Sequence, residues 1–340
     1  MNSSITLSGN FYSANNLNDL KNEINPELYS FLIEWFNKED VILLKTSGST
    51  GVAKTISVLK KKMILSAQKT GSFLNLEPGN KALCCLPLNY IAGKMMVVRA
   101  ITLGLNLTVV EPSKAPFKDL TEDYIFSACT PHQLENSVND LSRIKILLVG
   151  GAPISEKTRV RLNGSKNKIY ETFGMTETVS HVALKNISKG EKSFKALDDI
   201  RFKSNNGCLK IYSTELLEAP ITTSDIVDLQ SEKEFVWKGR QDFIINSGGI
   251  KINPEVVEKT LSGFISTPFI VLGLPDNTLG EKLIIAFEKE TPSNYSKAIE
   301  TLSSFEKPKM VFNFINFKRV NNKILRRDVL KTILSINESN

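Results

Sequence analysis

The chain has 340 residues, 41% of them hydrophobic and 23% charged, which is enough to bury a large core and is typical of a soluble protein of about two domains. Its net charge of +7 is diffuse rather than gathered in a basic patch, which argues against nucleic acid as a partner. The longest apolar region is interrupted by charges and the N-terminus has no signal-peptide pattern, so we expect no membrane span and a cytoplasmic location.

The first 240 residues repeat a unit in which a buried strand passes through a polar or glycine-containing loop into a helical segment. Helices are expected at 26–36, where Pro26 favours a helix start, at 58–75 and at 93–104; strands are expected at 41–45, 81–88 and 105–112; combined strand-to-helix units are expected at 124–138 and 144–155. Such repeats predict an α/β fold with parallel and mixed sheets, and ligand loops at the strand ends.

The pattern changes near residues 239–242. Beyond them the sequence alternates short strands and helices, which predicts a small C-terminal α+β domain over 240–340 after a large domain over 1–239. In this part we expect a helix at 253–263, strands at 269–276 and 281–290, a helix at 295–305 and a strand at 309–317.

The four cysteines are expected to be free thiols. Cys84 and Cys85 are adjacent in an apolar run, which is poor geometry for a mutual disulfide, and the sequence contains no C-x-x-C pair. With only two histidines, a metal site built from cysteine and histidine is not expected. Buried thiols in a reducing compartment account for these residues.

The loop TSGSTGVAKT, residues 46–55, has the composition of a phosphate cradle. It is almost a Walker A loop, but Ala53 stands where that loop needs its second glycine. The best buried strand downstream, IKILLVGG, ends in glycines instead of the aspartate that usually holds Mg²⁺. A flexible linker is the other alternative, although linkers rarely join a buried strand to a helix.

The same loop resembles the phosphate loop of the adenylate-forming superfamily, which includes acyl-CoA synthetases, luciferases and peptide-synthetase adenylation domains. The resemblance implies that hydroxyl groups, backbone N–H groups and a lysine of this loop contact the phosphates of ATP. The residues concerned are Thr46, Ser47, Gly48, Ser49, Thr50, Gly51 and Lys54.

Further stretches match the superfamily in its own order. ETFGMTET resembles the aromatic-Gly-x-Thr-Glu signature, which implies that Phe173 packs on adenine, Thr176 contacts the α-phosphate and Glu177 binds Mg²⁺. The family usually has tyrosine where Phe173 stands. LLVGGAPIS resembles the Gly-Ala-Pro turn that flanks the adenine, here formed by Gly151, Ala152 and Pro153.

The remaining matches concern the ribose, the hinge and the catalytic lysine. ITTSDIVDL implies that Asp225 accepts hydrogen bonds from the ribose hydroxyls, and GRQDFIINSGGIKINPEVVEK that Arg240 reaches the ribose, Asp242 is the hinge between the domains and Gly249 lines the tunnel for pantetheine. FKRVNNKILRR implies that Lys323 contacts the attacking carboxylate and the α-phosphate. Three positions depart from the family pattern. Glycine is usual where Ser224 and Asn322 stand, and proline is usual where Phe317 stands.

Within the superfamily, the chain resembles the o-succinylbenzoate–CoA ligases of menaquinone synthesis in its small size, the SGG at 247–249 and the stretch FGMTETVSHVALK. The chain is much shorter than ordinary acyl-CoA synthetases, and most of this difference in length lies before the phosphate loop. The substrate has two carboxylates, and the one that is not activated needs a hydrogen-bonding or cationic seat. Candidates for that seat are Tyr90, which stands where many relatives have histidine, Lys94, Ser180 and His181.

The resemblance therefore implies an enzyme that uses ATP, Mg²⁺ and CoA to convert a small carboxylic acid to its thioester through an acyl-adenylate. Two other readings stay open on the residues: adenylation of another acid with transfer to CoA or a carrier protein, and a non-catalytic nucleotide-binding relative. The presence of Lys323, Glu177 and Asp225 argues against the latter. A homodimer stays open as well.

Overall fold

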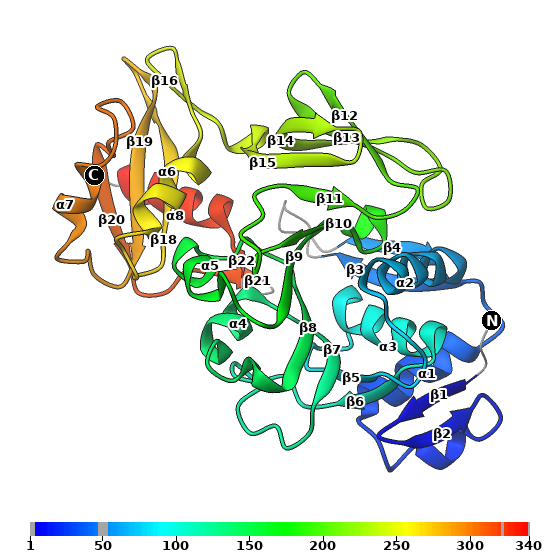
Figure 1. The fold of residues 1–340 in the computed structure, drawn as a ribbon. Coiled ribbons are helices and arrows are strands. Elements are labelled where there is room, and N and C mark those ends of the chain that lie inside the picture. Colours follow the sequence, from blue (N-terminus) through cyan, green and yellow to red (C-terminus); the bar gives the residue numbers. More distant parts are fainter. Residues whose placement is uncertain (1–3, 47–53, 321–322, 339–340) are drawn as a thin grey trace.

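The computed structural model describes residues 4–46, 54–320 and 323–338. A 13-stranded sheet dominates the first part of the chain, and a separate five-stranded sheet follows it on one side of the molecule (Figure 1). The expected α/β fold, with a large mixed sheet and a smaller C-terminal α+β unit, is confirmed. The large sheet ends at Arg240 and the small one begins at Ile245; that the two units are domains divided at 239–242 stays a prediction.

The large sheet runs in the order β12-β13-β14-β15-β11-β10-β9-β8-β7-β5-β6-β1-β2. Its six parallel strands are β1 (Ser4–Leu7), β5 (Lys81–Cys84), β6 (Asn106–Val109), β7 (Tyr124–Cys129), β8 (Ile144–Val149) and β9 (Lys168–Gly174). Antiparallel strands extend both ends: β2 (Asn10–Ser13) on one side, and on the other β10 (His181–Asn186), β11 (Phe194–Ala196), β12 (Arg201–Asn205), β13 (Cys208–Tyr212), β14 (Ile221–Ser231) and β15 (Glu234–Arg240).

Helices cover both faces of the parallel strands. They are α1 (Pro26–Phe36), α2 (Lys60–Leu74), α3 (Ile91–Leu103), α4 (Pro131–Ser137) and α5 (Glu156–Leu162), with short 3-10 turns η1 (Leu17–Leu20), η2 (Leu141–Arg143) and η3 (Thr176–Thr178). Alternate residues of β8 enter different cores: Leu148 joins the cluster under α2 and α3, whereas Leu147 joins the cluster that contains Leu134 of α4. This alternation buries the apolar residues of β8 on both faces of the sheet, and only Lys145 near its start is exposed.

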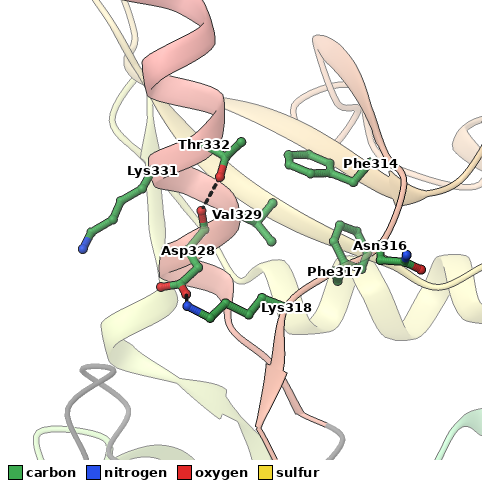
Figure 2. Close-up of a pocket in the computed structure, with 8 residues that line it drawn as sticks. All are labelled: Phe314, Asn316, Phe317, Lys318, Asp328, Val329, Lys331 and Thr332. Atoms are coloured by element: carbon green, nitrogen blue, oxygen red, sulfur yellow. Dashed lines mark hydrogen bonds and ion pairs between the residues drawn. The ribbon is translucent and has the colours of Figure 1, made fainter.

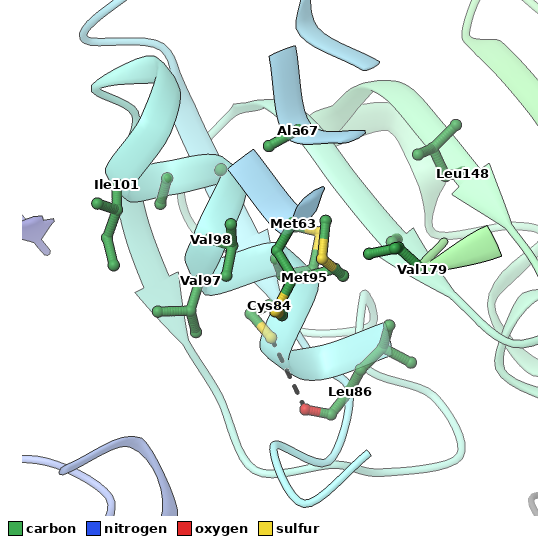
Figure 3. Packing of buried hydrophobic residues seen from close by; sticks show 14 of the residues in the cluster. Met63, Ala67, Cys84, Leu86, Met95, Val97, Val98, Ile101, Leu148 and Val179 are labelled. Carbon is green, nitrogen blue, oxygen red and sulfur yellow. Dashed lines mark hydrogen bonds between the residues drawn. The ribbon is translucent and has the colours of Figure 1, made fainter. Parts of the chain in front are cut away.

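The core between α2, α3 and the sheet supports the loops discussed below. Figure 3 shows Met63 of α2 and Met95 of α3 in the same cluster as Cys84 of β5, and Val179, from the loop after β9, enters it. All four cysteines are buried free thiols, as expected. Burial raises the pKa of the Cys84 thiol to about 11, so this group behaves as a small apolar side chain.

The phosphate-loop region differs from the sequence expectation. The strand at 41–45 is present as β3 (Val41–Thr46), but residues 54–59, partly included in the expected helix, form a second strand, β4 (Lys54–Leu59), antiparallel to it. Ile42 and Leu44 are buried while Leu43 between them is exposed, so β3 has the alternation of a half-buried hairpin strand.

The C-terminal unit packs helices against its small sheet. It contains η4 (Gln241–Phe243), β16 (Ile245–Ser247), β17 (Ile250–Ile252), α6 (Pro254–Ser262), β18 (Phe269–Asp276), β19 (Gly280–Glu288), α7 (Tyr295–Ile299), β20 (Met310–Phe314), β21 (Arg319–Val320), β22 (Lys323–Ile324) and α8 (Arg326–Glu338). The helix expected over 295–305 ends at Ile299. The Thr301 hydroxyl donates to the Ala298 carbonyl at 2.7 Å, and Ser303 bonds to Glu306, so side chains compete with the backbone there.

Along the part of the chain that the structure covers, no helix combines the length and the apolar character that crossing a membrane requires.

Candidate functional site

The phosphate loop is closed by a hairpin. Thr46 at the end of β3 pairs with Lys54 at the start of β4. A Walker A loop instead passes from a strand directly into a helix, so the strand at Lys54 excludes that alternative. Ser47, Gly48, Ser49, Thr50 and Gly51 lie outside the described residues, and their contacts with phosphate stay predictions.

The loops that follow β8 and β9 lie at the same edge of the sheet, because these two strands are parallel neighbours. Gly150 packs so closely against β9 that a Cβ atom on it would lie 2.3 Å from the Thr172 hydroxyl oxygen. Gly151 follows with φ of +94°, a conformation that favours glycine, and starts the Gly151-Ala152-Pro153 turn. The structure thus brings this turn close to the end of the strand that carries Phe173.

Phe173 is half-buried at the end of β9 in a group of aromatic rings. Its ring centroid lies 5.7 Å from that of Phe194 and 5.0 Å from that of Phe235, which itself makes an edge contact with Phe202. Thr176 and Glu177 follow in η3, where the Glu177 side chain is exposed. An exposed carboxylate just beyond this edge of the sheet can coordinate Mg²⁺ together with phosphate oxygens.

A buried ion cluster links the strands and the helix behind this edge of the sheet, and the sequence analysis did not predict it. Glu171 of β9 forms ion pairs of 2.6 Å with both Arg159 of α5 and Lys185 of β10, and it accepts the backbone N–H of Ile154, next to the Gly-Ala-Pro turn, at 3.3 Å. Burial alone would raise the pKa of Glu171, but the two cations overcome this and hold it below its ordinary value. A charged residue inside the apolar strand KIYETF was the available signal.

The two expected ribose ligands are direct neighbours across strands β14 and β15, where Asp225 is in register with Arg240. Asp225 is buried and accepts a hydrogen bond of 2.8 Å from the indole N–H of Trp237. Arg240 donates through Nε and Nη2 to both carboxylate oxygens of Asp242, each at 2.9 Å, and to the Ser224 hydroxyl. The residue expected to be the hinge therefore anchors the arginine expected to contact the ribose.

The junction between the two sheets is also held by α6. The backbone N–H of Arg240 donates to Glu255 of α6 at 2.7 Å, and Asn253 donates to the carbonyl of Lys238 at 2.8 Å. Burial raises the pKa of Glu255 above its ordinary value. Gly249 lies apart from these contacts, in the exposed two-residue turn between β16 and β17, with φ of +80°.

Lys323 begins β22, which forms a short antiparallel pair with β21; its side chain lies outside the described residues. A cavity of about 390 Å³ lies nearby, floored by Phe314, Phe317 and Val329, with an ion pair of 3.0 Å between Lys318 and Asp328 at its rim (Figure 2). None of the predicted site residues whose side chains the structure describes lines it, so these residues do not form the expected nucleotide site there.

The four residues expected around the acid separate into two groups. Tyr90 is exposed directly before α3, and Lys94, one turn into α3, turns to α1: its ammonium lies 2.8 Å from a carboxylate oxygen of Glu34 and 4.8 Å from the ring centroid of Phe31. The Lys94 charge is thus already neutralised by a side chain of the protein.

Ser180 and His181 meet in the interior, next to a residue that the sequence analysis did not single out. The guanidinium of Arg99, from the middle of α3, donates to the Ser180 hydroxyl at 3.0 Å. The Nε2 atom of His181 lies 3.0 Å from the Thr70 hydroxyl of α2, and its Nδ1 atom 3.5 Å from the Ser180 hydroxyl. Two helices and the start of β10 therefore converge on one buried polar cluster.

Arg99 is a buried cation that has no carboxylate partner in the described part of the chain. It is 3% exposed, no acidic side chain within the described ranges forms an ion pair with it, and its Nε has no hydrogen-bond partner there. Burial lowers its pKa to about 10. Its signal in the sequence was a charge inside the apolar helical run MMVVRAI, which the analysis used only to exclude a membrane span.

The chain matches the AMP-binding enzyme family over residues 9–203. A solved structure described as an acyl-CoA synthetase (AMP-forming)/AMP-acid ligase II-like protein from Dyadobacter fermentans is 33% identical, with a TM-score of 0.61; the match covers 92% of this chain and 95% of that one. The protein therefore belongs to the AMP-binding, adenylate-forming enzyme family.

More distant relatives carry more specific names. The 2-succinylbenzoate–CoA ligase of Staphylococcus aureus is 27% identical over 77% of this chain, which spans only 60% of that enzyme's length. The o-succinylbenzoate CoA synthetase of Bacillus subtilis, solved in complex with its acyl-adenylate intermediate, is 19% identical with a TM-score of 0.75, covering 84% of this chain and 68% of that one. At this identity the structural likeness supports the fold alone.

The burial of His181 yields a prediction about pH. Burial, followed by the charge of Arg99, lowers the pKa of His181 well below its ordinary value of 6.5. The unfolded chain then binds a proton that the folded chain excludes, so stability falls as pH drops below about 6.5, by at most about 1.4 kcal/mol per pH unit. Denaturant unfolding of the wild type and of His181→Asn between pH 7 and pH 5 measures this; the variant should lose that part of the slope, and equal slopes would contradict the assignment.

Proposed function

We propose that the chain is an ATP-dependent carboxylic acid–CoA ligase that works through an acyl-adenylate, with o-succinylbenzoate as its acid. The observation that carries the choice of acid is the buried Arg99 guanidinium, which has Ser180 and His181 beside it and no carboxylate partner among the described residues. The site follows directly after η3, which carries Thr176 and Glu177. Curated relatives named 2-succinylbenzoate–CoA ligase add support.

The physical argument rests on the cost of an unpaired buried charge. Removing a guanidinium from water costs several kcal/mol unless an anion and further hydrogen bonds compensate it. A substrate that carries a second carboxylate supplies that anion. o-Succinylbenzoate has one carboxylate on its ring and one on its succinyl arm, so one can be activated while the other pairs with Arg99. The neutral hydroxyl of Ser180 orients the guanidinium without neutralising it.

In the first step, an oxygen of the reacting carboxylate attacks the α-phosphorus of ATP and forms a new P–O bond. The bond from the α-phosphorus to the oxygen that bridges to the β-phosphate breaks, and pyrophosphate leaves with that oxygen and the bonding electrons. The residues we assign to ATP are the phosphate loop, Phe173 and the Gly151–Pro153 turn on the adenine, and Asp225 and Arg240 on the ribose. Thr176 and Lys323 donate to the α-phosphate, where charge develops. Glu177 would hold Mg²⁺, which, when bound with ATP, supplies neutralising charge at the phosphates.

In the second step, the thiol of CoA attacks the acyl carbonyl, its proton leaves, and AMP departs. We assign the pantetheine route to the side of Gly249, in the turn between β16 and β17; Figure 1 labels β16, the first strand of the C-terminal unit. Rotation of that unit about Asp242 would bring it to the adenylate and withdraw Lys323. The contacts of Arg240 with Asp242, Ser224 and Glu255 are those that such a rotation must rearrange.

The acid assignment predicts a result for Arg99→Gln. The wild type should prefer o-succinylbenzoate about 10²-fold in kcat/KM over an analogue that keeps the carboxylate to be activated and lacks the other one, because buried polar groups left without a partner reject a ligand strongly. Arg99→Gln should lose most of this preference, because its kcat/KM for o-succinylbenzoate should fall while its kcat/KM for the analogue stays unchanged. Lys94→Gln is the matched control: the Lys94 charge faces Glu34, so any loss of activity should affect both acids equally. A preference retained by Arg99→Gln and lost by Lys94→Gln would reverse the assignment.

The role of Lys323 is tested by separating the half-reactions. Lys323→Ala should abolish adenylate formation, measured as ATP–pyrophosphate exchange, because the lysine stabilises charge only in that step. Thioester formation from preformed acyl-adenylate and CoA should persist within about threefold. Lys318→Ala, a nearby lysine paired with Asp328 at the surface, controls for general effects on the C-terminal unit. Equal loss of both half-reactions in a folded Lys323→Ala protein would refute the role.

A further inference from the structure

The segment that joins the expected magnesium ligand to the buried polar cluster contains a strained turn. Val179 has φ of +68° and ψ of −51°, and the backbone N–H of Ser180 donates to the carbonyl of Thr178 at 2.8 Å, which together define a γ-turn centred on Val179. A β-branched side chain at positive φ is a genuine outlier. Such strain persists only where the surroundings hold it in place.

Two side chains hold the turn. The hydroxyl of Thr178, which is fully buried, accepts the backbone N–H of Met175 at 3.0 Å and lies 2.9 Å from the Met175 carbonyl and 2.7 Å from the Ser180 carbonyl, one of which receives its proton. The Val179 side chain is buried in the cluster with Met63 and Met95 (Figure 3). The threonine thus fastens both sides of the turn, and the valine anchors its centre in the core.

A third contact fixes the turn from the sheet. Gly174, the last residue of β9, is paired with His181, and a Cβ atom on it would lie 2.3 Å from the Ser180 carbonyl oxygen and 2.5 Å from the His181 Cα. The residue after the turn therefore has no room to shift toward β9. Because the Ser180 hydroxyl accepts from Arg99, the position of that hydroxyl determines the direction of the guanidinium.

We propose that Thr178 and Val179 are positioning residues, and that their strained turn holds Glu177 on the nucleotide side in fixed register with Ser180, and through Ser180 with Arg99, on the acid side. This inference rests on the proposed function for the identity of the two sides. Neither residue touches the reacting groups. Their effect is to keep the metal ligand and the seat of the second carboxylate at a constant separation, so that an acid bound at Arg99 presents its other carboxylate to the phosphate.

The test uses Thr178→Val, which keeps the shape of the side chain but removes the partner of the Met175 N–H and of the one carbonyl that receives the hydroxyl proton. The preference in kcat/KM for o-succinylbenzoate over the analogue that retains only the activated carboxylate should fall about tenfold, as expected when one hydrogen-bonded contact in a buried site is lost. Thr178→Ser, which keeps the hydroxyl, should restore the preference to within about threefold of wild type. Val179→Gly keeps the hydrogen bonds but releases the strained backbone, and should reduce the preference as well.

Ser127→Ala is the control, because it removes another fully buried hydroxyl that donates to a backbone carbonyl, that of Leu83 at 2.8 Å, in the interior of the sheet. It should lower the melting temperature like Thr178→Val but leave the acid preference unchanged. An unchanged preference in both Thr178→Val and Val179→Gly would overturn the proposal.

The ring signals of His181 provide a readout that does not depend on activity. They should shift in ¹H–¹⁵N spectra of Thr178→Val and not in those of Ser127→Ala, because Ser180 lies within 3.5 Å of the His181 ring. If the wild type activates neither o-succinylbenzoate nor the analogue, the proposed function fails. The spectra then provide the remaining test of whether Thr178 positions Ser180. Spectra of Thr178→Val identical to those of the wild type would then overturn it.

Discussion

The buried guanidinium of Arg99 is the constraint on which the site depends. A charge that is 3% exposed and has no anion among the described residues lowers the stability of the ligand-free fold, yet the surrounding structure is arranged to keep it: an apolar helix carries it, and the Ser180 hydroxyl directs it. A buried guanidinium that has no acidic partner in the part of the chain that the structure describes is explained if an anion arrives with the ligand. The fold then loses stability in the free state and gains discrimination in the bound state.

A second constraint links the residues that we assign to the nucleotide with the orientation of the C-terminal unit. Asp225 and Arg240 face each other across β14 and β15, and Arg240 also binds Asp242, the first acidic residue beyond the large sheet. Any ligand that takes hydrogen bonds from Arg240 competes with Asp242. If Arg240 binds the ribose as proposed, occupancy of the nucleotide site and the orientation of the C-terminal unit would share this arginine. This arrangement gives a physical route by which the nucleotide can influence the small unit, because it binds one orientation better than another.

Much of the fold could be predicted from the sequence because the parallel strands are apolar on both faces and end in glycine or proline turns, as at Gly150 and Gly151. The hairpin strand at 54–59 was missed because its short alternation runs directly into the helical period of α2. The motifs placed Phe173, Glu177, Asp225 and Arg240 in order, but they could not show which partners these side chains have. Lys94 illustrates the limit: only the tertiary structure pairs it with Glu34 and leaves Arg99, one and a half turns further on, without an acidic partner among the described residues.

The central claim is that Arg99 is retained for an anion of the ligand, and thermal unfolding of Arg99→Met tests it most directly. Methionine is apolar and similar in length, so the variant should melt at a higher temperature than the wild type without ligand, by roughly 1–2 °C for about 1 kcal/mol in a chain of this size. Saturating o-succinylbenzoate with ATP should raise the melting temperature of the wild type well beyond the rise caused by ATP alone, and should add nothing to that of Arg99→Met. A less stable variant that keeps the full rise with o-succinylbenzoate would contradict the account.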